Sequence, residues 1–158
     1  MQKISPCLWF DGKAEEAMTF YMSIFGNSKV LSVLRHGEAG PGPKGSVLAV
    51  GFELDGVEIM ALNGGPDFQF TPAISLFVKC ATQGEIDHFW GKLLAGGGKT
   101  QHCGWLTDKY GVSWQIVPTV LGEMLQDKDA AKAQRAMQAM LGMVKLDIAA
   151  LTKAYEGR

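Results

Sequence analysis

Two stretches of the chain share one pattern: EAMTFY at residues 16–21 and EIDHFW at residues 85–90. Each begins with glutamate, ends in two aromatic residues and follows a short apolar run and a break, which is typical of an amphipathic helix behind a strand. The runs LWF at residues 8–10 and LFV at residues 76–78 precede them in the same order. We interpret this shared order as an internal duplication.

The first copy covers residues 4–63 and is predicted to form a strand, a helix and three more strands. Apolar positions at helical spacing predict a helix over residues 13–25, and Asp11 is expected to cap it. The sequence DG at residues 55–56 predicts a tight hairpin turn. The strands are expected at residues 4–10, 28–36, 46–54 and 57–62.

The second copy covers residues 74–117 and repeats this order. The sequence TQGE at residues 82–85 is a capping box at the start of its helix. Its strands are expected at residues 74–80, 99–103, 104–108 and 112–117. A tail of good helix formers follows at residues 119–156, and Gly142 is expected to divide it. The predicted fold class is therefore α+β, with two βαβββ modules of curled mixed sheets and C-terminal helices in a single domain of residues 1–158.

Composition excludes several classes of partner. The formal net charge is −1, from 15 basic and 16 acidic side chains, so nothing favours nucleic acid. Charged residues interrupt every apolar run before the ~20 residues that cross a bilayer, and the N-terminus does not resemble a signal peptide. Three widely spaced cysteines are a poor disulfide framework, so we expect reduced thiols and a cytoplasmic protein.

The duplicated unit resembles the vicinal oxygen chelate superfamily of glyoxalases, extradiol dioxygenases and bleomycin-resistance proteins. The chain looks most like its PhnB-like branch, which often carries the label "3-demethylubiquinone-9 3-methyltransferase". The resemblance covers nearly the whole chain. It lies in PCLWFDG at residues 6–12, EEA with FY at residues 15–21, LNGGP at residues 62–66, CGWLTDKYGVSWQIVP at residues 103–118, and AM and KLDI in the tail.

This resemblance implies a fold, an assembly and a type of site. Each module would curl into a half-barrel, and two modules would enclose a cleft. The protein would be a homodimer, and whether the modules pair within one chain or across subunits is left open. In metal-dependent relatives, His or Glu from the first and last strand of each module hold a divalent ion that chelates two neighbouring substrate oxygens.

The chain departs from that metal pattern at every position. By comparison with the family, the ligands should fall near Pro6, at Leu62 or Asn63, within residues 73–75, and at Gln115. A divalent site needs three or four His, Asp, Glu or Cys side chains that converge. We therefore predict no tightly bound metal and no other cofactor.

The methyltransferase label meets a similar difficulty. Sites of the common kind for S-adenosylmethionine need a glycine-rich turn from a strand into a helix. The glycine-rich segments of this chain, at residues 37–45, 64–65 and 96–98, follow a helix or lead into a loop or another strand.

Five side chains are candidates for a small-molecule pocket. Trp9 and Trp105 offer apolar surface with an N–H group, and Asn63 and Gln115 offer amides. Cys7 could be a pocket thiol, but we expect it to be a small buried residue. If Gln115 points inward, alternation places Trp114 beneath a helix. Residues 108–111 are interpreted as a turn with a solvated charge pair.

Three classes of function remain open from the sequence. The leading hypothesis is a module that binds a small, partly apolar molecule in a metal-free cleft. The enzyme alternatives are a lyase, isomerase or dioxygenase that borrows a weakly held metal, or the methyltransferase of the label. The third is a structural dimer whose pocket is filled by its own Phe and Met side chains. Whether any reaction is catalysed, and by which residues, is left open.

Overall fold

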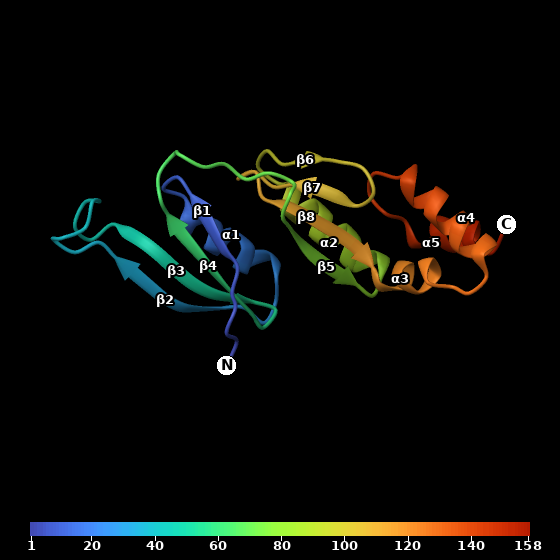
Figure 1. The fold of residues 1–158 in the computed structure, drawn as a ribbon, viewed down its shortest axis with the longest axis horizontal. Helices are drawn as coiled ribbons and strands as arrows, with labels where there is room; N and C mark the ends of the chain where they lie inside the picture. Colours follow the sequence, from blue (N-terminus) through green and yellow to red (C-terminus); the bar gives the residue numbers. More distant parts are fainter. The chain divides into compact units, whose positions relative to one another are not determined.

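The computed structural model describes residues 1–158, which form two compact units, residues 1–70 and residues 71–158 (Figure 1). The first unit contains one helix and one four-stranded sheet in the order β1-β4-β3-β2, in which β1 and β4 are parallel and the other pairs antiparallel. Its elements are β1 (Cys7–Phe10), α1 (Ala14–Ile24), β2 (Lys29–Arg35), β3 (Val47–Leu54) and β4 (Val57–Asn63).

The second unit repeats this topology with its own sheet in the order β5-β8-β7-β6, where β5 and β8 are the parallel pair. Its elements are β5 (Ser75–Cys80), α2 (Gln83–Leu94), β6 (Lys99–Thr100), β7 (Trp105–Thr107) and β8 (Ser113–Pro118). The equal order of strands in the two sheets confirms the predicted pair of βαβββ modules.

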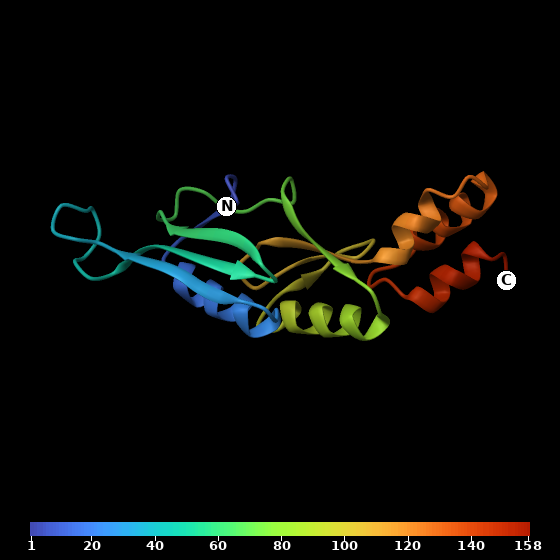
Figure 2. The same ribbon diagram turned by 90° about the horizontal axis from the view of Figure 1, so that it is seen from below.

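Helices α1 and α2 each cover one face of the sheet in their own unit (Figure 2). In the first unit Ala17, Tyr21 and Ile24 of α1 are buried, and in the second Ile86 and Leu93 of α2 are. These buried residues recur at helical spacing, and the sequence pattern therefore predicted the positions of α1 and α2.

The start of α1 differs from the prediction. No side chain within the helix caps it, and Asp11 makes no such bond. The Oδ1 atom of Asn63, at the end of β4, instead accepts a hydrogen bond of 2.9 Å from the backbone N–H of Ala14. The cap therefore comes from a residue 49 positions away, which no local signal reveals.

The strand predicted over residues 99–103 is also shorter, because β6 comprises only Lys99–Thr100. Cys103 and Gly104 have φ angles of 62° and 83°, which do not fit a strand. Their backbone N–H groups donate to the carbonyl oxygens of Met143 and Val144, each at 2.8 Å. The tail thus takes the hydrogen bonds that a longer strand would have used.

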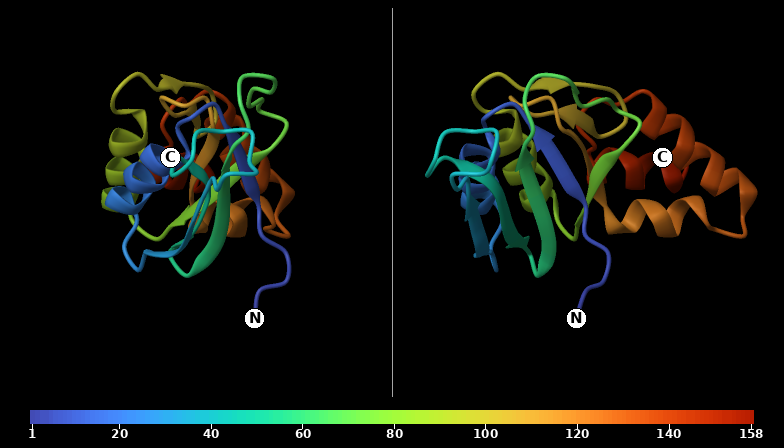
Figure 3. Two further views of the ribbon diagram at one scale, coloured as in Figure 1. Left: turned by 90° about the vertical axis from the view of Figure 1, so that its left-hand side faces the viewer. Right: turned by 60° about the vertical axis from the view of Figure 1, so that its left-hand side comes forward.

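The tail is helical and belongs to the second unit (Figure 3). Its helices are α3 (Thr119–Leu125), α4 (Ala130–Leu141) and α5 (Ile148–Tyr155). Gly142 caps the C-terminus of α4, which confirms the predicted division there. Their apolar faces meet in a buried cluster of Leu121, Met124, Ala136 and Leu151, which Leu146 joins from the segment between α4 and α5. No helix of the protein has the length and apolar character needed to cross a membrane.

Candidate functional site

A pocket of about 590 Å³ lies in the second unit, between its sheet and the tail. The sheet contributes Phe77, Trp105 and Gln115, and the tail contributes Leu125 and Met140. The other residues that line it are Lys79, Cys103, Val117, Pro118, Thr119, Leu121, Gly122, Glu123 and Gln126. The volume falls within the range of roughly 300–1,000 Å³ that holds a small organic molecule.

Alternation along the strands decides which side chains reach the pocket. In β8, Trp114 and Ile116 are buried, at 2% and 0% exposed, whereas Gln115 and Val117 line the pocket. Successive side chains of a strand point to opposite faces, so the first pair faces α2 and the second pair the open face. The expectation that Trp114 lies beneath a helix while Gln115 points the other way is confirmed.

Gln115 is held in place by a neighbouring strand. Its side-chain amide donates a hydrogen bond of 3.0 Å to the hydroxyl of Ser75 on β5. The amide carbonyl has no protein partner, so it is a hydrogen-bond acceptor on the pocket wall. Phe77, level with Gln115 on the adjacent strand, is 53% exposed and gives apolar surface beside it.

Two charged side chains line the pocket without an ion pair, Lys79 from β5 and Glu123 from α3. Both are exposed, so each remains hydrated when the pocket is empty. The pocket therefore combines an apolar surface with a few polar groups, the usual composition of a small-molecule site.

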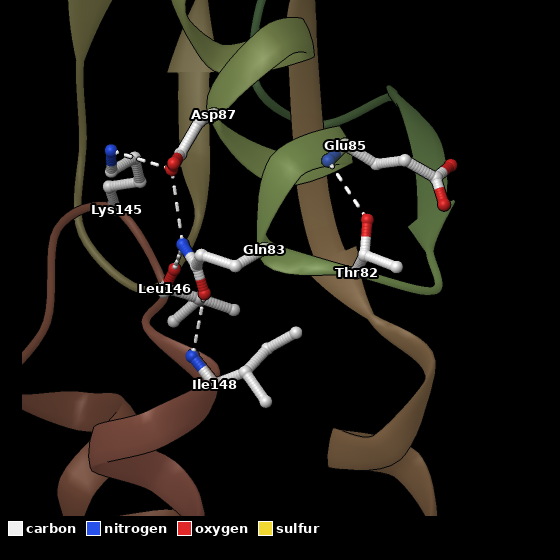
Figure 4. A network of polar contacts seen from close by, with 7 residues as sticks. All are labelled: Thr82, Gln83, Glu85, Asp87, Lys145, Leu146 and Ile148. Carbon is white, nitrogen blue, oxygen red and sulfur yellow. Dashed lines mark hydrogen bonds and ion pairs between the residues drawn. The ribbon is translucent and has the colours of Figure 1, made fainter.

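A network of hydrogen bonds and one ion pair connects the tail to α2 (Figure 4). The amide of Gln83 donates to the carbonyl oxygen of Leu146 at 3.1 Å and to Asp87, and its oxygen accepts from the N–H of Ile148 at 2.8 Å. Lys145 forms an ion pair with Asp87 at 2.8 Å. These contacts hold the segment between α4 and α5 against the start of α2.

We expect acid to weaken this attachment. The hydrogen bond from Lys145, followed by that from Gln83, lowers the pKa of Asp87 below its ordinary value of 3.8. The unfolded chain therefore takes up this proton first, so the stabilisation is complete above that value and is lost as pH falls through the lowered pKa. Urea unfolding of wild type and Asp87→Asn at pH values above and below 3.8 should show a difference in midpoint that shrinks in acid. A constant difference would contradict this assignment.

The other candidate residues lie in the first unit. The ring of Trp9 packs edge-on against Phe68 at 5.0 Å, and its Nε1–H donates to the carbonyl oxygen of Gly65 at 2.9 Å. A side chain at Gly64 would lie 2.3 Å from that ring, so glycine is needed there.

The side-chain amide of Asn63 makes two hydrogen bonds. Its oxygen caps α1, and its N–H₂ group donates to the carbonyl oxygen of Val47 at 3.1 Å. The structure thus groups Trp105 with Gln115 in one pocket, whereas Trp9, Asn63 and Cys7 belong to the other unit.

All three cysteines are free, and their surroundings differ. Cys7 is exposed, so the expectation of a buried small residue is wrong: at the start of β1 its side chain points away from α1, unlike the buried Leu8 that follows it. Burial, followed by the charge of Glu85, raises the pKa of Cys80 to about 11, so this thiol stays neutral. Cys103 lines the pocket, and its place on a turn held by the tail gave no signal in the sequence.

The interpretation of residues 108–111 as a turn with a solvated charge pair is only half right. Gly111 has a φ angle of 89°, as the turn requires. Asp108, however, is 3% exposed, and its carboxylate accepts a hydrogen bond of 2.9 Å from the indole N–H of Trp114. The carboxylate is thus part of the core beneath the pocket floor.

The strand register identifies the positions that correspond to family metal ligands. Trp9 pairs with Leu62 in the first unit as Phe77 pairs with Gln115 in the second, so Leu62 rather than Asn63 is the counterpart of Gln115. Leu62 supplies no ligand atom and Gln115 only a weak amide oxygen. Neither unit brings together three or more His, Cys, Asp or Glu side chains able to hold a metal. The residues present do not fit a resident divalent ion.

The turns from strand to helix do not fit a common nucleotide-type site either. The turn from β1 into α1 contains one glycine, Gly12, and the turn from β5 into α2 contains none. The third, from β8, enters α3 directly at Thr119. A glycine-rich turn that brings backbone N–H groups to a phosphate or cofactor is absent from all three.

Comparison with known proteins shows the relatives of this arrangement. Residues 2–117 match the model of a family described as 3-demethylubiquinone-9 3-methyltransferase. A solved structure described as a putative 3-demethylubiquinone-9 3-methyltransferase, PhnB protein, from Bacillus cereus is 45% identical. That match covers 75% of this chain and 100% of the other, with a TM-score of 0.68. No curated protein shows significant similarity to this chain.

More distant structures share the fold. Protein PA1353 from Pseudomonas aeruginosa is 22% identical, with a TM-score of 0.61 over 75% of this chain and 98% of its own. The fosfomycin resistance protein FosX from Listeria monocytogenes is 16% identical, with a TM-score of 0.54 over 78% of this chain and 97% of its own. At these identities the likeness concerns the architecture of the modules.

Proposed function

We propose a function for this chain from its family: it belongs to the PhnB-like family described as 3-demethylubiquinone-9 3-methyltransferase, within the vicinal oxygen chelate superfamily. The proposed function is to bind a small, partly apolar molecule in the pocket of the second unit. This binding would not use a metal ion. The observation that carries this proposal is the pocket of about 590 Å³, lined by Phe77, Trp105 and Met140 beside the free carbonyl of Gln115. An apolar body would pack on the rings and the sulfur, and one polar group of the ligand would donate to that carbonyl.

The absence of fitting ligands at the family positions supports binding without a metal. Where metal-dependent relatives would carry a glutamate, Gln115 keeps a neutral amide whose N–H₂ already donates to Ser75. An amide oxygen alone holds a divalent ion weakly, because it brings no negative charge. The protein would therefore recognise the ligand by shape and hydrogen bonding.

Native mass spectrometry of freshly purified protein tests this proposal. We expect a retained small molecule and less than one metal ion per chain. One tightly held divalent ion per chain would overturn the proposal and favour the metal-dependent lyase, isomerase or dioxygenase. Saturable binding of S-adenosylmethionine in the same instrument would favour the methyltransferase of the family description.

Replacement of Trp105 by alanine is expected to weaken ligand retention about tenfold or more, because it removes the largest ring from the pocket wall. Trp9→Ala, an indole removed from the other unit, is the matched control and should leave retention unchanged. Titration of the retained molecule back into ligand-stripped protein measures both affinities. Equal effects of the two variants would place binding elsewhere.

A homodimer is the second part of the proposal. The edge strand β2 is exposed along its whole length, and Val30, Leu31, Val33 and Leu34 are 47%, 42%, 40% and 56% exposed. Because alternate residues face opposite sides, both faces of this edge are apolar. Such an edge favours aggregation unless another chain covers it, and a second copy is the partner that the family resemblance implies.

Leu34→Lys is therefore expected to shift the protein from dimer to monomer, because a buried charge without a partner opposes association. Val57→Lys, at a position 50% exposed on β4, is the control and should leave the mass unchanged. Sedimentation equilibrium measures the masses. A monomeric wild type, or a dimer that persists in Leu34→Lys, would refute this interface.

We also assign the protein to the cytoplasm, which the three free cysteines support.

A further inference from the structure

The tail follows the part of the chain over which the family match runs. The family match ends at residue 117, one position before the last residue of β8. The Bacillus cereus protein is covered over 100% of its length by 75% of this chain. Residues 118–158 follow the part of the chain that matches the family, and we call them the C-terminal extension.

The C-terminal extension supplies a wall of the pocket. Leu121 and Leu125 of α3 and Met140 of α4 line it, opposite residues of the sheet such as Trp105. A module that ended with β8 would leave that side of the pocket open to water. Phe77 is 53% exposed even with the extension in place, so the sheet alone encloses little.

The extension is fixed against the sheet at several points. Cys103 and Gly104 donate to the carbonyl oxygens of Met143 and Val144, and the side chain of Leu146 packs on Gly104, where an added Cβ would lie 3.0 Å from its Cδ1. Within the extension, the guanidinium of Arg135 donates to the last carbonyl oxygens of α5, at Ala154 and Tyr155. These contacts attach the extension to the turn before β7 and join α4 to the end of α5.

We infer that the C-terminal extension determines the size of the ligand, limiting it to a small aromatic or branched apolar molecule that fits beneath Leu125 and Met140. This inference rests on the proposed function. Both side chains are half-buried and pack against the margin of the buried cluster, so shortening them should enlarge the pocket while the five buried residues of that cluster are kept. A rigid wall excludes any ligand that overlaps its side chains, because tight packing leaves little room to adjust.

Two fluorescent probes of different size test this inference: anilinonaphthalene sulfonate (ANS) and its doubled form, bis-ANS. Cys103 reports occupancy of the pocket, since it lines the wall, and exposed Cys7 in the other unit is an internal control. Alkylation of each thiol by iodoacetamide, followed by mass spectrometry, gives its rate. Saturating ANS should slow the alkylation of Cys103 and leave that of Cys7 unchanged.

Leu125→Ala and Met140→Ala are expected to raise the affinity for bis-ANS relative to ANS about tenfold, measured as protection of Cys103. Leu141→Ala is the matched control, because Leu141 lies on α4 next to Met140 but is 58% exposed and outside the pocket. Thermal unfolding by circular dichroism shows that each variant is folded. Two variants on two helices are used so that one unstable protein does not decide the outcome.

The results separate the two proposals. If ANS protects Cys103 but the ratio of affinities is unchanged in both wall variants, the extension does not set ligand size, and the pocket remains a binding site. If ANS and bis-ANS both fail to protect Cys103 in the wild type and in the enlarged variants, the pocket does not bind apolar molecules, and both proposals fall.

Discussion

Replacement of Asp108 by alanine is expected to lower the free energy of unfolding by about 3–5 kcal/mol. The carboxylate is 3% exposed and accepts hydrogen bonds from the backbone N–H groups of Tyr110 at 2.9 Å and Val112 at 3.1 Å and from the indole of Trp114 at 2.9 Å. Alanine would leave these donors without their acceptor in a buried place, where water replaces it poorly. Urea unfolding followed by tryptophan fluorescence measures the change.

Two further variants are compared with Asp108→Ala, one at a hydrogen-bond donor and one at an exposed control position. Trp114→Phe removes one of these donors and keeps an aromatic ring, so it should cost less than Asp108→Ala, and the double variant should show strong coupling between the two. Asp67→Ala, at an exposed aspartate, should change stability by less than about 0.5 kcal/mol. A loss below about 1 kcal/mol for Asp108→Ala would mean that its carboxylate is hydrated in solution.

Leu146→Ala is expected to destabilise the C-terminal extension by about 2–5 kcal/mol, because it opens a cavity in a packed cluster. Leu146 is fully buried, belongs to the cluster formed by α3, α4 and α5, and contacts the turn at Gly104. The same change therefore loosens both the core of the extension and its attachment to the sheet. Hydrogen exchange measured by mass spectrometry should show faster exchange over residues 119–158.

Leu141→Ala is the matched control for Leu146→Ala, since the exposed Leu141 should change stability by less than about 0.5 kcal/mol. Because the extension forms a wall of the pocket, Leu146→Ala should also weaken ligand retention although its side chain is absent from the lining. Unchanged exchange over the extension, together with unchanged ligand retention, would show that this cluster does not hold the wall.

The duplicated modules could be predicted because their signals are local. Helical spacing within residues 16–21 and 85–90, the DG turn at residues 55–56 and the capping Thr82 each involve neighbours within a few positions. The alternation in β8 likewise predicted opposite directions for Trp114 and Gln115, and the structure confirms them. The three helices of the tail and the break at Gly142 follow from composition and spacing in the same way.

The site, in contrast, depends on partners far apart in the chain. Asn63 caps a helix that begins 49 residues earlier, Gln83 reaches Leu146 across 63 residues, and Met140 joins Trp105 in one pocket. Local sequence fixes the face on which a side chain lies, because periodicity acts between neighbours. Burial, capping and the enclosure of a pocket depend on which distant backbone groups and side chains pack there, and only the tertiary structure decides that.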